Sequence, residues 1–132
     1  MLGIIRRAAG PLALAIIGFA PVFAPAAAQQ PFTAKAFAAA QASGNPVLIE
    51  IHADWCPTCK AQEPILGKLS AEPVFSKIVR LRVDFDKQKD IVKQFRARYQ
   101  STLMLFKGKT EVARSMGETD EAEIRAMLKK AV

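Results

Sequence analysis

Hydrophobic and polar positions divide the chain into segments with strand and helix periodicity. Residues 47–52 are almost continuously apolar and β-branched, which predicts a strand covered on both faces in a parallel sheet. Apolar residues then recur at helical spacing, so we expect a helix over residues 57–70 that is kinked at Pro64. An alanine-rich helix over residues 32–42 should precede the strand, after a short tail that reaches Pro31.

The second half of the chain continues this alternation and ends in a hairpin and a helix. The expected elements are a strand over 78–84, an amphipathic helix over 87–99, a strand over 102–106, a hairpin strand over 111–116 and a helix opened by Thr119. No internal repeat or long linker interrupts this order. The order of elements predicts an α/β fold with a mixed central β-sheet flanked by helices.

The first 28 residues have the composition of a secretory signal. Arg6 and Arg7 form a basic start, residues 8–23 are uncharged and largely apolar, and Ala26–Ala28 provide the small side chains of a cleavage site. We therefore expect a signal peptide that is cut after Ala28, and an exported, periplasmic protein. The alternative is a retained membrane anchor, because the uncharged run approaches the roughly 20 helical residues that cross a bilayer.

Cleavage would separate the signal peptide, residues 1–28, from one domain over residues 29–132. These 104 residues suffice for a single hydrophobic core. Loss of two arginines with the signal lowers the formal net charge from +7 to +5. The remaining basic residues are scattered and do not alternate with aromatic residues, so we expect no nucleic-acid partner. We expect a monomer that contacts a membrane only if the signal segment is retained.

The only two cysteines, Cys56 and Cys59, are separated by two residues at the predicted junction of strand and helix. A disulfide between them would close too short a loop to stabilise the fold much, whereas an exported thiol pair suits disulfide exchange. A helix N-terminus favours an anion, so Cys56 is the candidate nucleophile in its thiolate form. Cys59 lies one helical turn on and is the candidate resolving thiol. Pro57 suits the first turn, where N–H groups have no intrahelical acceptor.

The segment around the cysteines, Ala53-Asp54-Trp55-Cys56-Pro57-Thr58-Cys59-Lys60, resembles the active site of the thioredoxin family. Pro64 stands where members of that family carry a helix-kinking proline. The strand that begins at Thr102 and the glycine after the hairpin, Gly117, also match the family pattern. The resemblance covers residues 32–132 and is more specific than an isolated Cys-x-x-Cys motif.

This resemblance implies a thioredoxin-like fold and a protein thiol-disulfide oxidoreductase whose redox group is the Cys56–Cys59 disulfide. We expect no cofactor, because the sequence has no flavin or nucleotide motif, and therefore a redox partner protein must exchange electrons with the pair. The residues expected to face protein disulfide substrates are Trp55, Pro57, Thr58 and Ser101.

Glu50 matches the position of the buried acid that lies behind the cysteines in thioredoxins. In a strand that is otherwise apolar, desolvation would favour the protonated carboxyl, which suits Glu50 to accept a proton from Cys59 during resolution. The alternative is a glutamate that faces solvent, because the register of an unbroken apolar strand is hard to fix from sequence.

Three residues or pairs depart from the thioredoxin pattern. Ser101, preceded by Gln100, replaces the cis-proline, and since a non-proline cis bond costs about 3 kcal/mol, we expect a trans peptide or an altered loop. Pro57-Thr58 replaces Gly-Pro, which changes the dipeptide that tunes the redox potential. His52 stands where thioredoxins usually have an aromatic residue.

Two classes of function remain open from the sequence. The first is an exported oxidoreductase that acts as a reductant, favoured by Glu50 and the Trp55-Cys56 context, although Pro57 resembles the more oxidising periplasmic members. The second is a non-catalytic thioredoxin-fold module that binds a partner or handles copper or another metal. In that case Cys56 and Cys59, with His52 and Asp54, would be ligands, or the cysteines would form a passive bridge. A histidine at a strand end is, however, more often a packed or surface residue.

Overall fold

The computed structural model describes residues 28–132, so the predicted signal peptide, apart from Ala28, lies outside the described part of the chain. The strands are β1 (Gln30–Pro31), β2 (Val47–His52), β3 (Val79–Asp84), β4 (Thr102–Lys107) and β5 (Thr110–Met116). The helices are α1 (Ala34–Ala42), α2 (Pro57–Ser70), α3 (Lys89–Gln94) and α4 (Glu121–Leu128), with short 3-10 turns η1 (Pro73–Phe75) and η2 (Lys129–Ala131).

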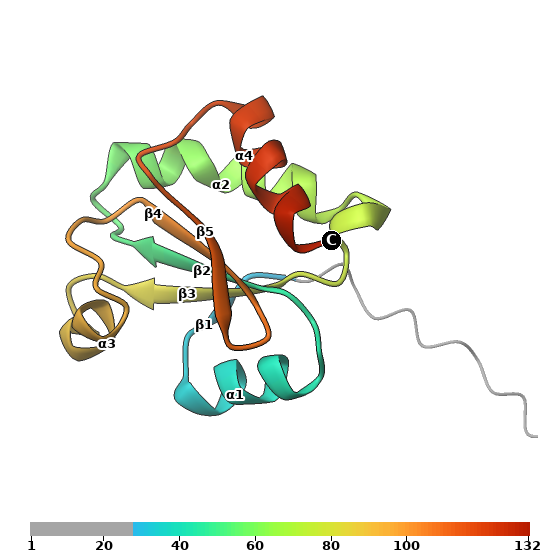
Figure 1. The fold of residues 1–132 in the computed structure, drawn as a ribbon. Coiled ribbons are helices and arrows are strands. Elements are labelled where there is room, and N and C mark those ends of the chain that lie inside the picture. The colour runs from blue at the N-terminus through green and yellow to red at the C-terminus, as the bar shows by residue number, and fades with distance from the viewer. Residues whose placement is uncertain (1–27) are drawn as a thin grey trace, which may run out of the picture.

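The strands form one mixed sheet in the order β1-β3-β2-β4-β5. β1, β3 and β2 are parallel, whereas β4 pairs antiparallel with both β2 and β5. Helices α2 and α4 cover one face of the sheet, and α1 and α3 cover the other (Figure 1). This arrangement is the thioredoxin-like mixed α/β fold that the sequence predicts. Within residues 28–132, no helix is both long and apolar enough to cross a membrane.

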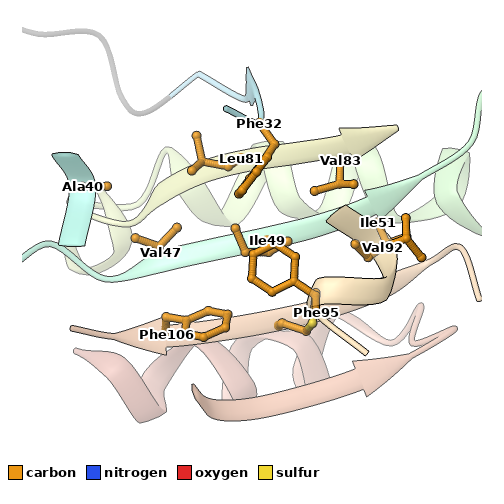
Figure 2. Close-up of a cluster of buried hydrophobic side chains, with 11 residues drawn as sticks. Phe32, Ala40, Val47, Ile49, Ile51, Leu81, Val83, Val92, Phe95 and Phe106 are labelled. Atoms are coloured by element: carbon orange, nitrogen blue, oxygen red, sulfur yellow. The ribbon is translucent and has the colours of Figure 1, made fainter. Parts of the chain in front are cut away.

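The central strand β2 is buried along its whole length, because helices cover both of its faces. Figure 2 shows the cluster on the α1 and α3 face, which includes Val47, Ile49 and Ile51 together with Phe95 and Phe106. On the opposite face, a second cluster lies beneath α2 and α4. It consists of Leu48, Leu66, Leu69, Phe75, Ile78, Leu103, Leu105, Ile124, Met127, Leu128 and Ala131. By strand alternation, Glu50 projects toward this second face.

The predicted bounds of β2 and α2 are confirmed, and α2 continues through Pro64. Four other expectations are wrong in detail. The first helix begins at Ala34, two residues later than expected, because Thr33 is its N-cap. The tail that ends at Pro31 forms the strand β1, which pairs with β3. The helix expected to extend to residue 99 ends at Gln94, because Arg96 adopts a left-handed φ of 53°. The last helix begins one residue later than expected, since Asp120 is its N-cap.

Candidate active site

Cys56 is the N-cap of α2 and lies just beyond the end of β2. The backbone N–H of Cys59 donates a hydrogen bond to Cys56 Sγ over 3.1 Å. A first-turn N–H group therefore points at this sulfur, which lies at the positive end of the helix dipole. Both cysteines are free thiols, and each is only 2% exposed. The structure places the pair at the strand–helix junction where the sequence predicts it.

Cys59 lies on the side of α2 that faces the sheet. Its Sγ is 4.0 Å from the carbonyl oxygen of Ile51 in β2. Burial, reinforced by a hydrogen bond with Cys56, raises the pKa of the Cys59 thiol to about 11, although backbone groups of Ala53 and Ser101 partly oppose this. Cys59 is therefore protonated at neutral pH. The two thiols have different environments, and only Cys56 receives an N–H group at its sulfur from the start of α2.

Trp55 forms an exposed part of the rim next to Cys56. The residue is 57% exposed, and its indole Nε1–H donates to Asp86 Oδ2 over 2.8 Å. This bond fixes the indole against Asp86, while much of the ring surface remains accessible. Pro57 is also exposed and Thr58 is partly buried. Trp55, Pro57 and Thr58 are thus at least partly accessible next to the cysteines, and their contact with a substrate stays a prediction.

Ser101 lies opposite the cysteines, and its backbone is close enough to Cys59 to lower the pKa of that thiol. No cis peptide bond occurs within residues 28–132, so the Gln100–Ser101 peptide is trans, as expected from the sequence. Ser101 has a φ of 60°, which is unusual for a residue with a Cβ. Its N–H donates to Ile51 O over 2.8 Å, and its carbonyl accepts from the N–H of Gly117 over 3.0 Å.

Gln62 connects α2 to the loop of Ser101. Its Nε2 donates to Ser101 O over 3.1 Å and to Glu118 O over 2.9 Å, and the residue is 4% exposed. One buried amide therefore satisfies two backbone carbonyls from separate loops. Gln62 is not among the site residues predicted from the sequence. Helical spacing could have identified it, because Gln62 lies three residues after Cys59 and four before Leu66, on the same inward face.

Glu50 is buried, so the alternative of a solvent-facing glutamate is wrong. The expectation that its carboxyl lies alone among apolar groups is also wrong. Arg80, which is itself buried, donates from Nε to Glu50 Oε1 over 2.6 Å and from Nη2 to Oε2 over 3.2 Å. Arg82 Nη2 lies 3.7 Å from the same carboxylate. These cations offset the desolvation of the carboxylate, and the role of Glu50 in proton transfer stays a prediction.

His52 extends this set of charged groups toward the surface. Its Nε2 lies 3.3 Å from Asp54 Oδ1 and 3.9 Å from Glu63 Oε1. Glu63 in turn pairs with Arg82 Nη2 over 2.8 Å. His52 is therefore a packed residue whose imidazole lies beside the carboxylates of Asp54 and Glu63. Within residues 28–132, no three His, Cys, Asp or Glu side chains are grouped to hold one metal ion, so the ligand set considered for His52 is not assembled.

Arg80, Arg82 and Asp86 are further site residues that sequence reasoning missed. Each makes its contact across a long separation in the chain, because β3 lies beside β2 in the sheet. The register pairs Glu50 with Arg82 directly. The sequence does show charged residues at alternate positions of β3, but their partners become evident only when the pairing of the strands is known.

Comparisons with known proteins agree with this geometry. A family model described as Thioredoxin matches residues 28–130. Thioredoxin from Chlamydia trachomatis is 37% identical over 94 residues, which are 71% of this chain and 89% of that protein. Mitochondrial thioredoxin from Mus musculus is 32% identical over 90 residues, 68% of this chain and 54% of that protein, so the chain spans about half the length of that relative. The crystal structure of Trxlp from Edwardsiella tarda has a TM-score of 0.74 and 44% identity, covering 76% of this chain and 98% of that one.

Proposed function

Because this chain belongs to the thioredoxin family, we propose that it is a thiol-disulfide oxidoreductase that exchanges its Cys56–Cys59 pair with disulfides of protein substrates. The observation that carries the proposal is the hydrogen bond from the Cys59 N–H to Cys56 Sγ at the N-cap of α2. This contact supports Cys56 as the nucleophile of the pair. The second sulfur is held one helical turn away, within the same buried cluster.

In the first step, the Cys56 thiolate attacks one sulfur of a substrate disulfide. The substrate S–S bond breaks, a mixed disulfide forms at Cys56, and the other substrate sulfur leaves as a thiolate that takes up a proton. Trp55 and Pro57 border the site of attack and would contact the substrate backbone or side chains. The loop of Ser101 bounds the site from the opposite side.

In the second step, Cys59 loses its proton and attacks Cys56 Sγ. The Cys56–Cys59 disulfide forms, the mixed disulfide breaks, and the second substrate sulfur leaves as a thiol after protonation, so two electrons have passed from the protein to the substrate. Because the pKa of Cys59 is about 11, a base that accepts its proton would accelerate this step. Glu50 is our candidate for that base. Its strand neighbour Ile51 contacts Cys59 through its carbonyl oxygen.

We propose that the protein acts as a reductant and that a partner protein regenerates its dithiol. The acid at position 50 and the Trp55-Cys56 context support this direction, whereas Pro57 favours a more oxidising pair. The reduction potential distinguishes the two directions. We expect a value near that of thioredoxin, about −270 mV, and a value near −120 mV would instead indicate an oxidant.

Export to the periplasm is part of the proposal and rests on the sequence of residues 1–28. In a Gram-negative host, we expect the mature protein to begin at Gln29 and to be released with the periplasmic fraction. N-terminal sequencing of the fractionated protein tests this directly. A chain that retains Met1 and sediments with membranes would support the anchored alternative.

The activity itself is tested by reduction of insulin disulfides with dithiothreitol as the electron source. The wild type should accelerate the reaction, and C56S should abolish the acceleration, because a serine hydroxyl cannot form the mixed disulfide. Full activity of C56S would overturn the proposed function. Two further measurements distinguish the binding-module alternative. Alkylation of the thiols in glutathione buffers shows whether the disulfide forms reversibly, and metal analysis of the purified protein shows whether metal is bound. Stoichiometric metal with no reversible disulfide would favour that alternative.

A further inference from the structure

A hollow of about 230 Å³ lies beside the end of β3 and the short helix α3. Its lining consists of Phe85, Asp86, Lys89, Val92, Lys93 and Arg98. Phe85 and Val92 are the apolar members and are largely shielded from solvent, whereas the charged members are exposed. The hollow therefore combines an apolar base with a charged rim.

The hollow shares residues with the surroundings of the active site. Phe85 also packs against the buried cluster that contains Cys56 and Cys59. Asp86 holds the indole of Trp55, the residue directly before Cys56. In Figure 1, α3 lies at the end of the sheet toward which the arrowheads of β2 and β3 point, the end where α2 begins. Phe85 and Asp86 thus connect the hollow to the surroundings of Cys56.

The rim carries an excess of positive charge. Lys89, Lys93 and Arg98 contribute three cations, and none of them forms an ion pair with another side chain of residues 28–132. The single acid of the rim, Asp86, accepts the Trp55 indole N–H. Nearby Asp84 is turned toward the backbone, where its Oδ1 accepts from the N–H groups of residues 86 and 87.

We propose that this hollow binds an acidic segment of the protein substrate next to the disulfide, with an aliphatic or aromatic side chain against Phe85 and Val92. The inference rests on the proposed function and names its substrate class. Unpaired cations around a concave apolar surface attract carboxylates and disfavour basic sequences. The contact would raise the rate of productive encounter more than the rate of the chemical steps, because none of these cations lies in the cysteine cluster.

Two disulfide peptides of the same sequence, except for two glutamates or two lysines beside one cysteine, test this specificity. We expect the wild type to reduce the acidic peptide with a kcat/KM about tenfold higher at low ionic strength, mainly through KM, and the difference to shrink in high salt. The K89E/K93E variant should reverse the preference. K89Q/K93Q should remove it without reversing it, which also provides a milder substitution if the charge reversal disturbs folding.

K107E/K109E is the matched control, because it changes the net charge by the same amount at the β4–β5 hairpin. That turn lies at the opposite end of β4 from Ser101 and the active site. The preference for the acidic peptide should be retained in this control. Equal kcat/KM for the two peptides in the wild type, or equal loss of preference in K107E/K109E, would overturn the inference alone. Failure of the wild type to reduce either peptide would instead count against the proposed function.

Discussion

The side chain of Gln62 joins the helix of the cysteine pair to the loop opposite it, through a 3.1 Å hydrogen bond from Nε2 to Ser101 O. The same amide donates to Glu118 O. Thioredoxins have a cis-proline at the position of Ser101. Here Ser101 adopts a φ of 60°, and its N–H and C=O both form hydrogen bonds within the protein. Gln62 therefore helps to position the loop beside Cys59.

Replacing Gln62 with methionine tests this positioning role. Q62M keeps the volume but removes the donor, so we expect a loss of about 1 kcal/mol in the free energy of unfolding, because two hydrogen bonds to backbone carbonyls are lost while Ser101 O still accepts from Gly117. We also expect KM for a protein disulfide to rise while kcat changes less. Chemical denaturation and insulin kinetics measure the two effects. An unchanged KM despite the loss of stability would restrict Gln62 to a structural role.

Introducing the proline that thioredoxins have at position 101 should destabilise this protein. Proline holds φ near −65° and has no N–H, whereas Ser101 has a φ of 60° and donates to Ile51 O. We expect S101P to lose more than about 1 kcal/mol of unfolding free energy. S101G is the control, since glycine adopts positive φ readily. Equal stability of S101P and wild type in urea would show that this loop accepts a different backbone conformation.

The buried Glu50–Arg80 pair predicts unequal effects of single and double substitutions. R80M should destabilise the protein by about 3 kcal/mol, because it leaves the Glu50 carboxylate buried with a more distant cation. E50Q/R80M should recover part of this loss, since neither buried charge remains. A double-mutant cycle from urea unfolding gives the coupling. Additive losses would show that the two side chains do not stabilise each other.

The same double variant tests whether Glu50 accepts the proton of Cys59, apart from its effect on stability. E50Q/R80M removes the carboxylate without leaving Arg80 uncompensated, so slower resolution of a mixed disulfide can be assigned to the lost base. Stopped-flow measurement of this step from pH 6 to pH 9 should show a deficit that diminishes as the pH rises toward the pKa of Cys59. Kinetics equal to those of the wild type across this range would remove Glu50 from the mechanism.

The raised pKa of Cys59 predicts how its reactivity depends on pH. In C56A, burial remains the main cause of the shift, so alkylation of Cys59 by iodoacetamide should keep rising through pH 9. A plateau below pH 9 would contradict the assigned environment. In the wild type, the folded state holds this proton more tightly than the unfolded chain. Its contribution to stability is therefore complete below about pH 9 and decreases as the pH rises toward 11.

Much of the fold could be predicted from local patterns. The continuous apolar run at residues 47–52 defines β2, and the helical spacing after Cys56 defines α2, since both elements are specified by nearby residues. In contrast, the two residues of β1 have no pattern of their own and form a strand only because they pair with β3. The helix α3 is shorter than its periodicity predicts, since Arg96 leaves the helical conformation and Tyr99 is exposed.

In the candidate site too, residues within the local motif could be predicted, whereas contacts between distant segments could not. Cys56, Cys59 and Trp55 could be assigned from one contiguous motif. Glu50 could be placed in the core, but its partner Arg80 lies 30 residues away and depends on the pairing of β2 with β3. The contact between Gln62 and the loop of Ser101 spans 39 residues and likewise depends on tertiary packing.

Trapping of the mixed disulfide tests most directly the claim that Cys56 attacks and Cys59 resolves. C59S, incubated in reduced form with a protein disulfide substrate, should accumulate a covalent complex that peptide mapping by mass spectrometry locates at Cys56. C56S should form little complex at neutral pH, because the raised pKa of Cys59 keeps its thiol protonated. A complex that forms through Cys59 in C56S as fast as through Cys56 in C59S would contradict the account.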